Sequence, residues 1–87
     1  MSETIRERAF AVVDKERDYQ ELRWERPEHV HSATEYLVYI DHYVKQGMTF
    51  VSTEDGERGA LGCLRKIAAL AVAAMEENGI EEREERE

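Results

Sequence analysis

Histidines and carboxylates that lie close together in the sequence are the first candidates for chemistry. His29 and His31 stand two residues apart, and Glu35 follows four residues later. This spacing matches neither a zinc finger nor the two histidines, one helical turn apart, of a zinc protease. The neighbouring pair of Asp41 and His42 completes no ligand pattern either. We therefore expect exposed or helix-capping histidines, with no metal and no cofactor.

Other reactive groups form no recognisable catalytic pattern. The position of Cys63 beside Ile67 on a helical wheel predicts a buried thiol and not a nucleophile. Gly56, Gly59 and Gly62 lack the preceding strand that a nucleotide-binding fingerprint requires. No set of serine, histidine and aspartate suggests a hydrolase. Binding is therefore favoured over covalent catalysis.

Aromatic and cationic side chains are better candidates for binding. Tyr36, Tyr39 and Tyr43 place three rings on one edge of a predicted helix. Such a row either packs at the rim of a core or forms an interface or base-stacking surface. Arg65 and Lys66 lie within a later helix, where they are either solvated or in contact with an anion or a partner.

Three helices must position these side chains, and the first spans residues 2–24. Its apolar residues recur at helical spacing, namely Ile5, Ala9, Val12 and Val13. Ser2 or Thr4 is suited to cap its start, and a linker around Pro27 follows its end. We expect this helix to pack across the other two.

The second and third helices are expected to form a long hairpin. Ser32 and Glu35 make a capping box that starts a helix over residues 33–50. The third helix spans residues 57–78, and Gly79 is suited to end it.

The third helix contains nine consecutive apolar residues, 67–75, and this run predicts self-association. A helix that is apolar nearly all round must be buried nearly all round. Nine residues are far fewer than the roughly 20 that span a bilayer. Because a short chain has little else to cover such a helix, we expect an all-α, three-helix chain that oligomerises through its third helix into a helical bundle.

Composition narrows the class of protein further. The chain has 87 residues, one cysteine and a net charge of −8. Proteins that bind a phosphate backbone usually present a basic patch, so direct nucleic-acid binding is not expected. The lone cysteine fits a reducing compartment, and no leader or membrane segment is evident, which predicts a cytoplasmic protein. Residues 1–80 are interpreted as one helical domain, and residues 81–87 as an acidic tail that is disordered or a frayed helix.

Parts of the chain resemble a group of small bacteriophage and prophage proteins. The resemblance rests on the segment 16–24 (ERDYQELRW), a tyrosine-rich helix after a histidine-bearing linker, and the segment 64–71 (LRKIAALA). These proteins in turn resemble the MazG-like, all-α nucleoside triphosphate pyrophosphatases. The resemblance implies a helical hairpin, an oligomer and, if the chain is phage-encoded, a place in the host cytoplasm. The candidate binding residues are Tyr19, Gln20, Trp24, Tyr36, Tyr39, Tyr43, Arg65 and Lys66.

The catalytic pattern of that superfamily is incomplete in this chain. The resemblance implies an E-x-x-E pair on one helix and an acidic pair on the next, which together hold Mg²⁺ against the phosphates. Here Val38 stands three residues after Glu35, and Cys63 and Lys66 stand near the positions of the second pair. We therefore expect a non-enzymatic, phage-type oligomer that binds itself and a protein or nucleotide partner.

Two alternatives stay open. One is a Mg²⁺-dependent nucleotide pyrophosphohydrolase whose metal ligands are Glu16, Glu35 and Asp41. The other is an acidic inhibitor that mimics a nucleic acid. The arginines mixed among the acids of the first helix count against this second alternative.

We expect no pyrophosphate release above background from ribonucleoside or deoxyribonucleoside triphosphates with Mg²⁺ or Mn²⁺. Holding Mg²⁺ beside a triphosphate takes a cluster of carboxylates, and a lysine at such a position repels the ion. A pyrophosphate-release assay across the common nucleotides makes the measurement. Turnover that disappears in Glu35→Gln would establish the hydrolase alternative instead.

Overall fold

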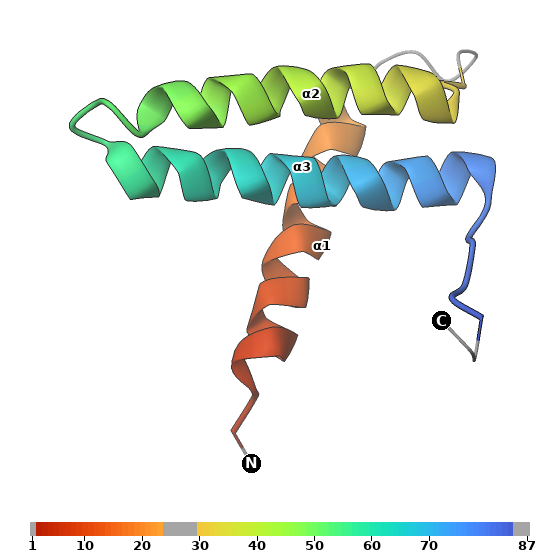
Figure 1. Cartoon of the computed structure of the whole chain (residues 1–87). Helices are drawn as coiled ribbons and strands as arrows, with labels where there is room; N and C mark the ends of the chain where they lie inside the picture. The colour runs from red at the N-terminus through yellow and green to blue at the C-terminus, as the bar shows by residue number, and fades with distance from the viewer. Residues whose placement is uncertain (1, 24–29, 85–87) are drawn as a thin grey trace.

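The computed structural model describes residues 2–23 and 30–84, which form three helices. α1 spans Ile5–Arg23, α2 spans Ala33–Phe50 and α3 spans Gly56–Asn78. α2 and α3 lie side by side as a hairpin, and α1 crosses behind them at a steep angle, with its N-terminal half extending past α3 (Figure 1). The predicted all-α, three-helix architecture is confirmed. Within the described ranges, no helix is both long and apolar enough to cross a membrane.

Local sequence sets the ends of these helices. The Thr4 hydroxyl accepts a hydrogen bond from the Glu7 amide at 3.0 Å, while the Glu7 carboxylate accepts from the Thr4 amide at 2.8 Å. Ser32 and Glu35 form the same reciprocal pair at the start of α2, at 3.1 and 2.8 Å, which confirms the predicted capping box. Gly79 ends α3 with a φ of 106°, a conformation that favours glycine.

The core lies between α2 and α3. Its buried centre and the half-buried residues around it are Tyr36, Leu70, Ala73, Ile40, Tyr43 and Ala74. The helices approach closely at Gly47, where an added Cβ would lie only 3.2 Å from the Cβ of Cys63. Cys63 is 3% exposed, so the prediction of a buried thiol is confirmed. Glycine at this position therefore permits the close crossing of the hairpin helices.

α1 packs on α3 through the C-terminal half of the helix, and its buried side chains there are polar. The buried residues of α1 are Arg17 and Gln20, both in its C-terminal half. Of the apolar residues at helical spacing, Ile5 is 84% and Val12 is 49% exposed, while Val13 is half-buried, so only the C-terminal part of that row packs on α3. The physical reason is the steep crossing, because only a short stretch of a helix touches a helix that it crosses at a large angle.

The acidic tail should be dispensable for folding. Residues 79–84 form no helix and are exposed. Residues 81–87 carry five acids and two arginines and no apolar side chain, so burial cannot repay the entropy of ordering them. We expect truncation after Ile80 to change the melting temperature, followed by circular dichroism, by less than a few degrees. A large drop would show that the tail docks on the helices.

Candidate functional site

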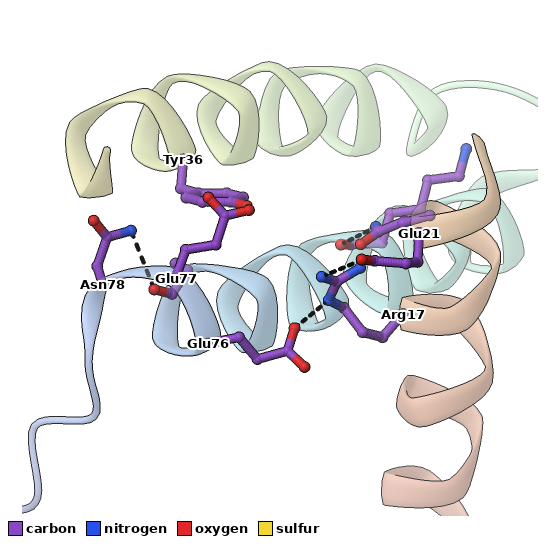
Figure 2. A network of polar contacts seen from close by, with 9 residues as sticks. Arg17, Glu21, Tyr36, Glu76, Glu77 and Asn78 are labelled. Atoms are coloured by element: carbon purple, nitrogen blue, oxygen red, sulfur yellow. Dashed lines mark hydrogen bonds and ion pairs between the residues drawn. The ribbon is translucent and has the colours of Figure 1, made fainter. Parts of the chain in front are cut away.

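A buried arginine joins α1 to the C-terminal part of α3. Arg17 is 9% exposed, and its Nε donates to Oε1 of Glu76 at 2.6 Å (Figure 2). Its Nη2 pairs with Oε2 of Glu21 at 2.7 Å. Burial lowers the pKa of the guanidinium, but the two carboxylates outweigh burial and the net shift is upward. The two glutamates therefore compensate for the desolvation of this charge at the helix crossing.

A second set of hydrogen bonds joins the start of α2 to the end of α3. The Tyr36 hydroxyl donates to Oε1 of Glu77 at 2.7 Å, and the His31 amide donates to Oε2 of the same residue at 2.8 Å. Asn78 Nδ2 donates to the His31 carbonyl at 3.1 Å. Burial, and then the bond to Glu77, raise the pKa of Tyr36, which is 1% exposed. Figure 2 shows this tyrosine pointing from α2 toward Glu77 on α3.

An open depression of about 320 Å³ lies beside these contacts. It is lined by Arg17, Asp18, Glu21, Glu76 and Glu77. Two of its glutamates pair with the arginine and a third accepts from a buried tyrosine. Among the residues that the structure describes, no cluster of histidine, cysteine, aspartate and glutamate could hold a metal ion. The depression is thus an acidic joint whose polar groups connect three helices.

The crossing of α1 and α3 brings together four predicted binding residues. Gln20 is 8% exposed, and its Nε2 donates to the Lys66 carbonyl at 3.3 Å. Lys66 Nζ lies 5.4 Å from the centre of the Tyr43 ring, which adds α2 to the contact. Arg65 Nε donates to Oε1 of Glu16 at 2.8 Å. These polar contacts are made within the chain, where they dock α1 on the hairpin.

The other predicted binding residues that the structure describes, Tyr19, Tyr36 and Tyr39, do not form one surface with these four. Tyr36 belongs to the core. Tyr39 is 40% exposed, and its ring meets that of His31 edge-on with 5.3 Å between centroids. Tyr19 is 54% exposed on α1. Trp24 lies outside the described residues.

The carboxylates of the hydrolase alternative take part in three separate contacts. Glu16 pairs with an arginine of α3. Glu35 completes the cap of α2 and lies 3.8 Å from Nδ1 of His31. Asp41 forms an exposed ion pair with a lysine one turn along α2. His29, the other ligand candidate, falls outside the described residues.

One side of α3 carries apolar residues that α1 and α2 leave exposed. They recur at alternating intervals of three and four residues, and we call them the α3 stripe: Leu61, Leu64, Ala68, Ala71 and Met75. The leucines are 61% and 56% exposed and the methionine 44%, while the two alanines are half-buried. Alternating intervals of three and four are the spacing of a coiled-coil seam. The α3 stripe therefore has the pattern of a surface that packs on another helix.

A second exposed row lies on α2, and we call it the α2 stripe: Leu37, Val44, Met48 and Val51. At helical spacing the sequence places Leu37, Ile40, Val44, Met48 and Val51 on one arc and the tyrosines on the adjoining arc. In the structure Ile40 of the first arc packs with Tyr36 and Tyr43 of the second against α3, and the other four residues of the first arc, with Val51 at the C-cap, stay exposed. Lys66 and Tyr43 meet on the side of the hairpin that faces α1, because the Lys66 carbonyl binds Gln20 of α1. Successive residues of a helix are rotated by about 100° around its axis. On this count the centre of the α3 stripe lies about 180° around α3 from Lys66, and the centre of the α2 stripe lies about 110° around α2 from Tyr43. Both stripes thus lie outside the contact with α1.

No family model, curated protein or solved structure matches the chain. The resemblance to the MazG-like pyrophosphatases therefore remains a hypothesis that rests on the segments 16–24 and 64–71. The functional argument rests on the two exposed stripes and on the polar contacts described above.

Sequence reasoning missed the residues of the acidic joint. The one local signal for Arg17 is the glutamate four residues later, Glu21. Exposed ion pairs in helices have the same spacing, so this signal does not indicate that Arg17 is buried. Glu77 has no local signal, since its partners Tyr36 and His31 are 41 and 46 residues away in the chain.

Tyr36→Phe should alter the alkaline stability of the protein. Folding raises the pKa of Tyr36, so above pH ~10 the unfolded chain loses this proton while the folded chain keeps it. Stability from this group is therefore full below pH ~10 and is lost as the pH rises further. We expect the melting temperature of the wild type to fall more steeply above that pH than that of Tyr36→Phe, measured by circular dichroism.

Tyr19→Phe is the matched control for this measurement, because it removes an exposed hydroxyl and keeps the buried one. It should follow the wild-type profile. Equal alkaline slopes for the wild type and Tyr36→Phe would contradict the assignment.

Proposed function

We propose that this chain is the protomer of a homo-oligomeric, non-enzymatic helical binding protein that self-associates through α3. The observation that carries the proposal is the α3 stripe, which stays exposed after α1 and α2 have packed. Rows of exposed leucine and methionine at coiled-coil spacing are typical of interfaces and are uncommon on monomers. The nine-residue apolar run of the sequence supports the same conclusion.

The small size of the internal core also supports self-association. The buried apolar residues of the described chain are Tyr36, Cys63, Ala69, Leu70 and Ala73, of which three are alanine or cysteine. Domains of this length are marginally stable on the surface that they can bury alone. Covering the two stripes with another subunit would bury large aliphatic side chains that the monomer leaves in water.

Binding is favoured over catalysis because the polar groups of the crossing already have partners inside the chain. Arg65 pairs with Glu16, and Arg17 pairs with two glutamates. A protein partner is therefore better supported than a nucleotide. A MazG-like hairpin without the paired carboxylates is consistent with this arrangement, and that kinship is part of the proposal.

We expect light scattering to give a mass for the wild type of at least twice the monomer mass of 10.1 kDa. Ala71→Glu places a charge on the α3 stripe, so it should leave the protein unfolded or aggregated, as shown by circular dichroism and light scattering. Ala11→Glu, at an exposed position of α1, is the matched control and should keep the wild-type mass. A well-folded wild-type monomer at micromolar concentration would contradict the proposal.

A further inference from the structure

We infer that the second copy of the chain packs antiparallel along the α3 stripe, with Ala68 of one subunit opposite the partner's Ala71. This inference rests on the proposed self-association and adds the orientation and register of the two subunits. It also identifies the flanking charges that select this orientation.

The order of side-chain sizes sets the centre of the contact. The α3 stripe has leucines at its N-terminal end, alanines in the middle and a methionine at its C-terminal end. An antiparallel pair centred between Ala68 and Ala71 places Leu64 opposite the partner's Met75. The small side chains then meet at the centre, where two helix backbones can approach most closely. The larger side chains fill the wider space on either side.

The charges beside the α3 stripe set the orientation. Arg58 and Arg65 flank one edge of the stripe in its N-terminal half, and Glu76 flanks the same edge in its C-terminal half. In an antiparallel pair the charged edge of one helix meets the charged edge of its partner, in the opposite direction. The arginines of one subunit then approach the partner's Glu76. In a parallel pair each edge meets the opposite edge, which is apolar from Ile67 to Ala74. Complementary charge therefore favours the antiparallel pair.

These charged groups retain surface for a partner. The side chains of Arg65 and Glu76 are 43% and 54% exposed, although each makes an ion pair within the chain. Arg58 is exposed at the start of α3. A charged group that is partly exposed can interact with a second opposite charge across an interface.

The surroundings of the stripe fit another copy better than other occupants. α1 crosses behind the hairpin (Figure 1) and meets α3 at Arg65 and Glu76. These residues are about 90° around α3 from the centre of the stripe, so the stripe itself is not covered by α1. The net charge of −8 disfavours an anionic membrane or a nucleic acid as the occupant.

Spin labels at the two ends of α3 test the orientation. In a Cys63→Ala background, Glu57→Cys and Ile80→Cys place labels just inside and just beyond the helix, at exposed positions. At ~1.5 Å of rise per residue, an antiparallel pair separates two Glu57→Cys labels by about 35–40 Å. When the two labelled chains are mixed, the distance between a Glu57→Cys label and an Ile80→Cys label of the partner should be below about 20 Å. All distances are measured by pulsed electron paramagnetic resonance.

The possible results separate the two proposals. The expected result is a long distance between two Glu57→Cys labels (the same-site distance) and a short distance between Glu57→Cys and Ile80→Cys labels in the mixture. A short same-site distance in a folded dimer would overturn the antiparallel orientation and leave self-association intact. A folded protein with the mass of one chain would overturn self-association itself. The unlabelled Cys63→Ala chain is the control, and it should keep the mass of the wild type.

Discussion

The fold depends on α3, because this one helix offers three different faces to its surroundings. One face packs on α2 around Leu70, Ala73 and Cys63. A second face receives the polar side chains of α1. The third face is the exposed α3 stripe. Apolar residues nearly all round a helix suit packing on more than one side, and under the proposed self-association the third face packs as well.

The polar contacts at the crossing determine which face of the hairpin stays available. Arg17, Gln20 and Glu16 each reach a different residue of α3, so α1 is held in one direction across the hairpin. Charged hydrogen bonds of this kind are directional, whereas apolar contacts tolerate sliding. Because α1 is fixed at these contacts, it leaves both apolar stripes exposed. The acidic joint is thus interpreted as a structural element that orients α1 beside the proposed interface.

The sequence predicts the parts of this fold that depend on neighbouring residues. Ser32 with Glu35 and the glycine at position 79 predict helix ends because caps are local. Periodicity predicts two adjoining apolar arcs on α2, but it cannot tell which members of each arc face α3, since both arcs are apolar. The burial of Arg17 also escapes prediction, because its partner Glu76 is 59 residues away. The joint and the choice of exposed face therefore require the three-dimensional structure.

The central claim is that another subunit covers the α3 stripe and so contributes to the stability of each chain. The most direct measurement is the melting temperature over about a hundredfold range of protein concentration. Association with the folded state makes that temperature depend on concentration, so the claim predicts a rise of several degrees from the lowest to the highest concentration. A melting temperature that stays constant over the whole range, in a protein with the mass of one chain, would contradict the claim.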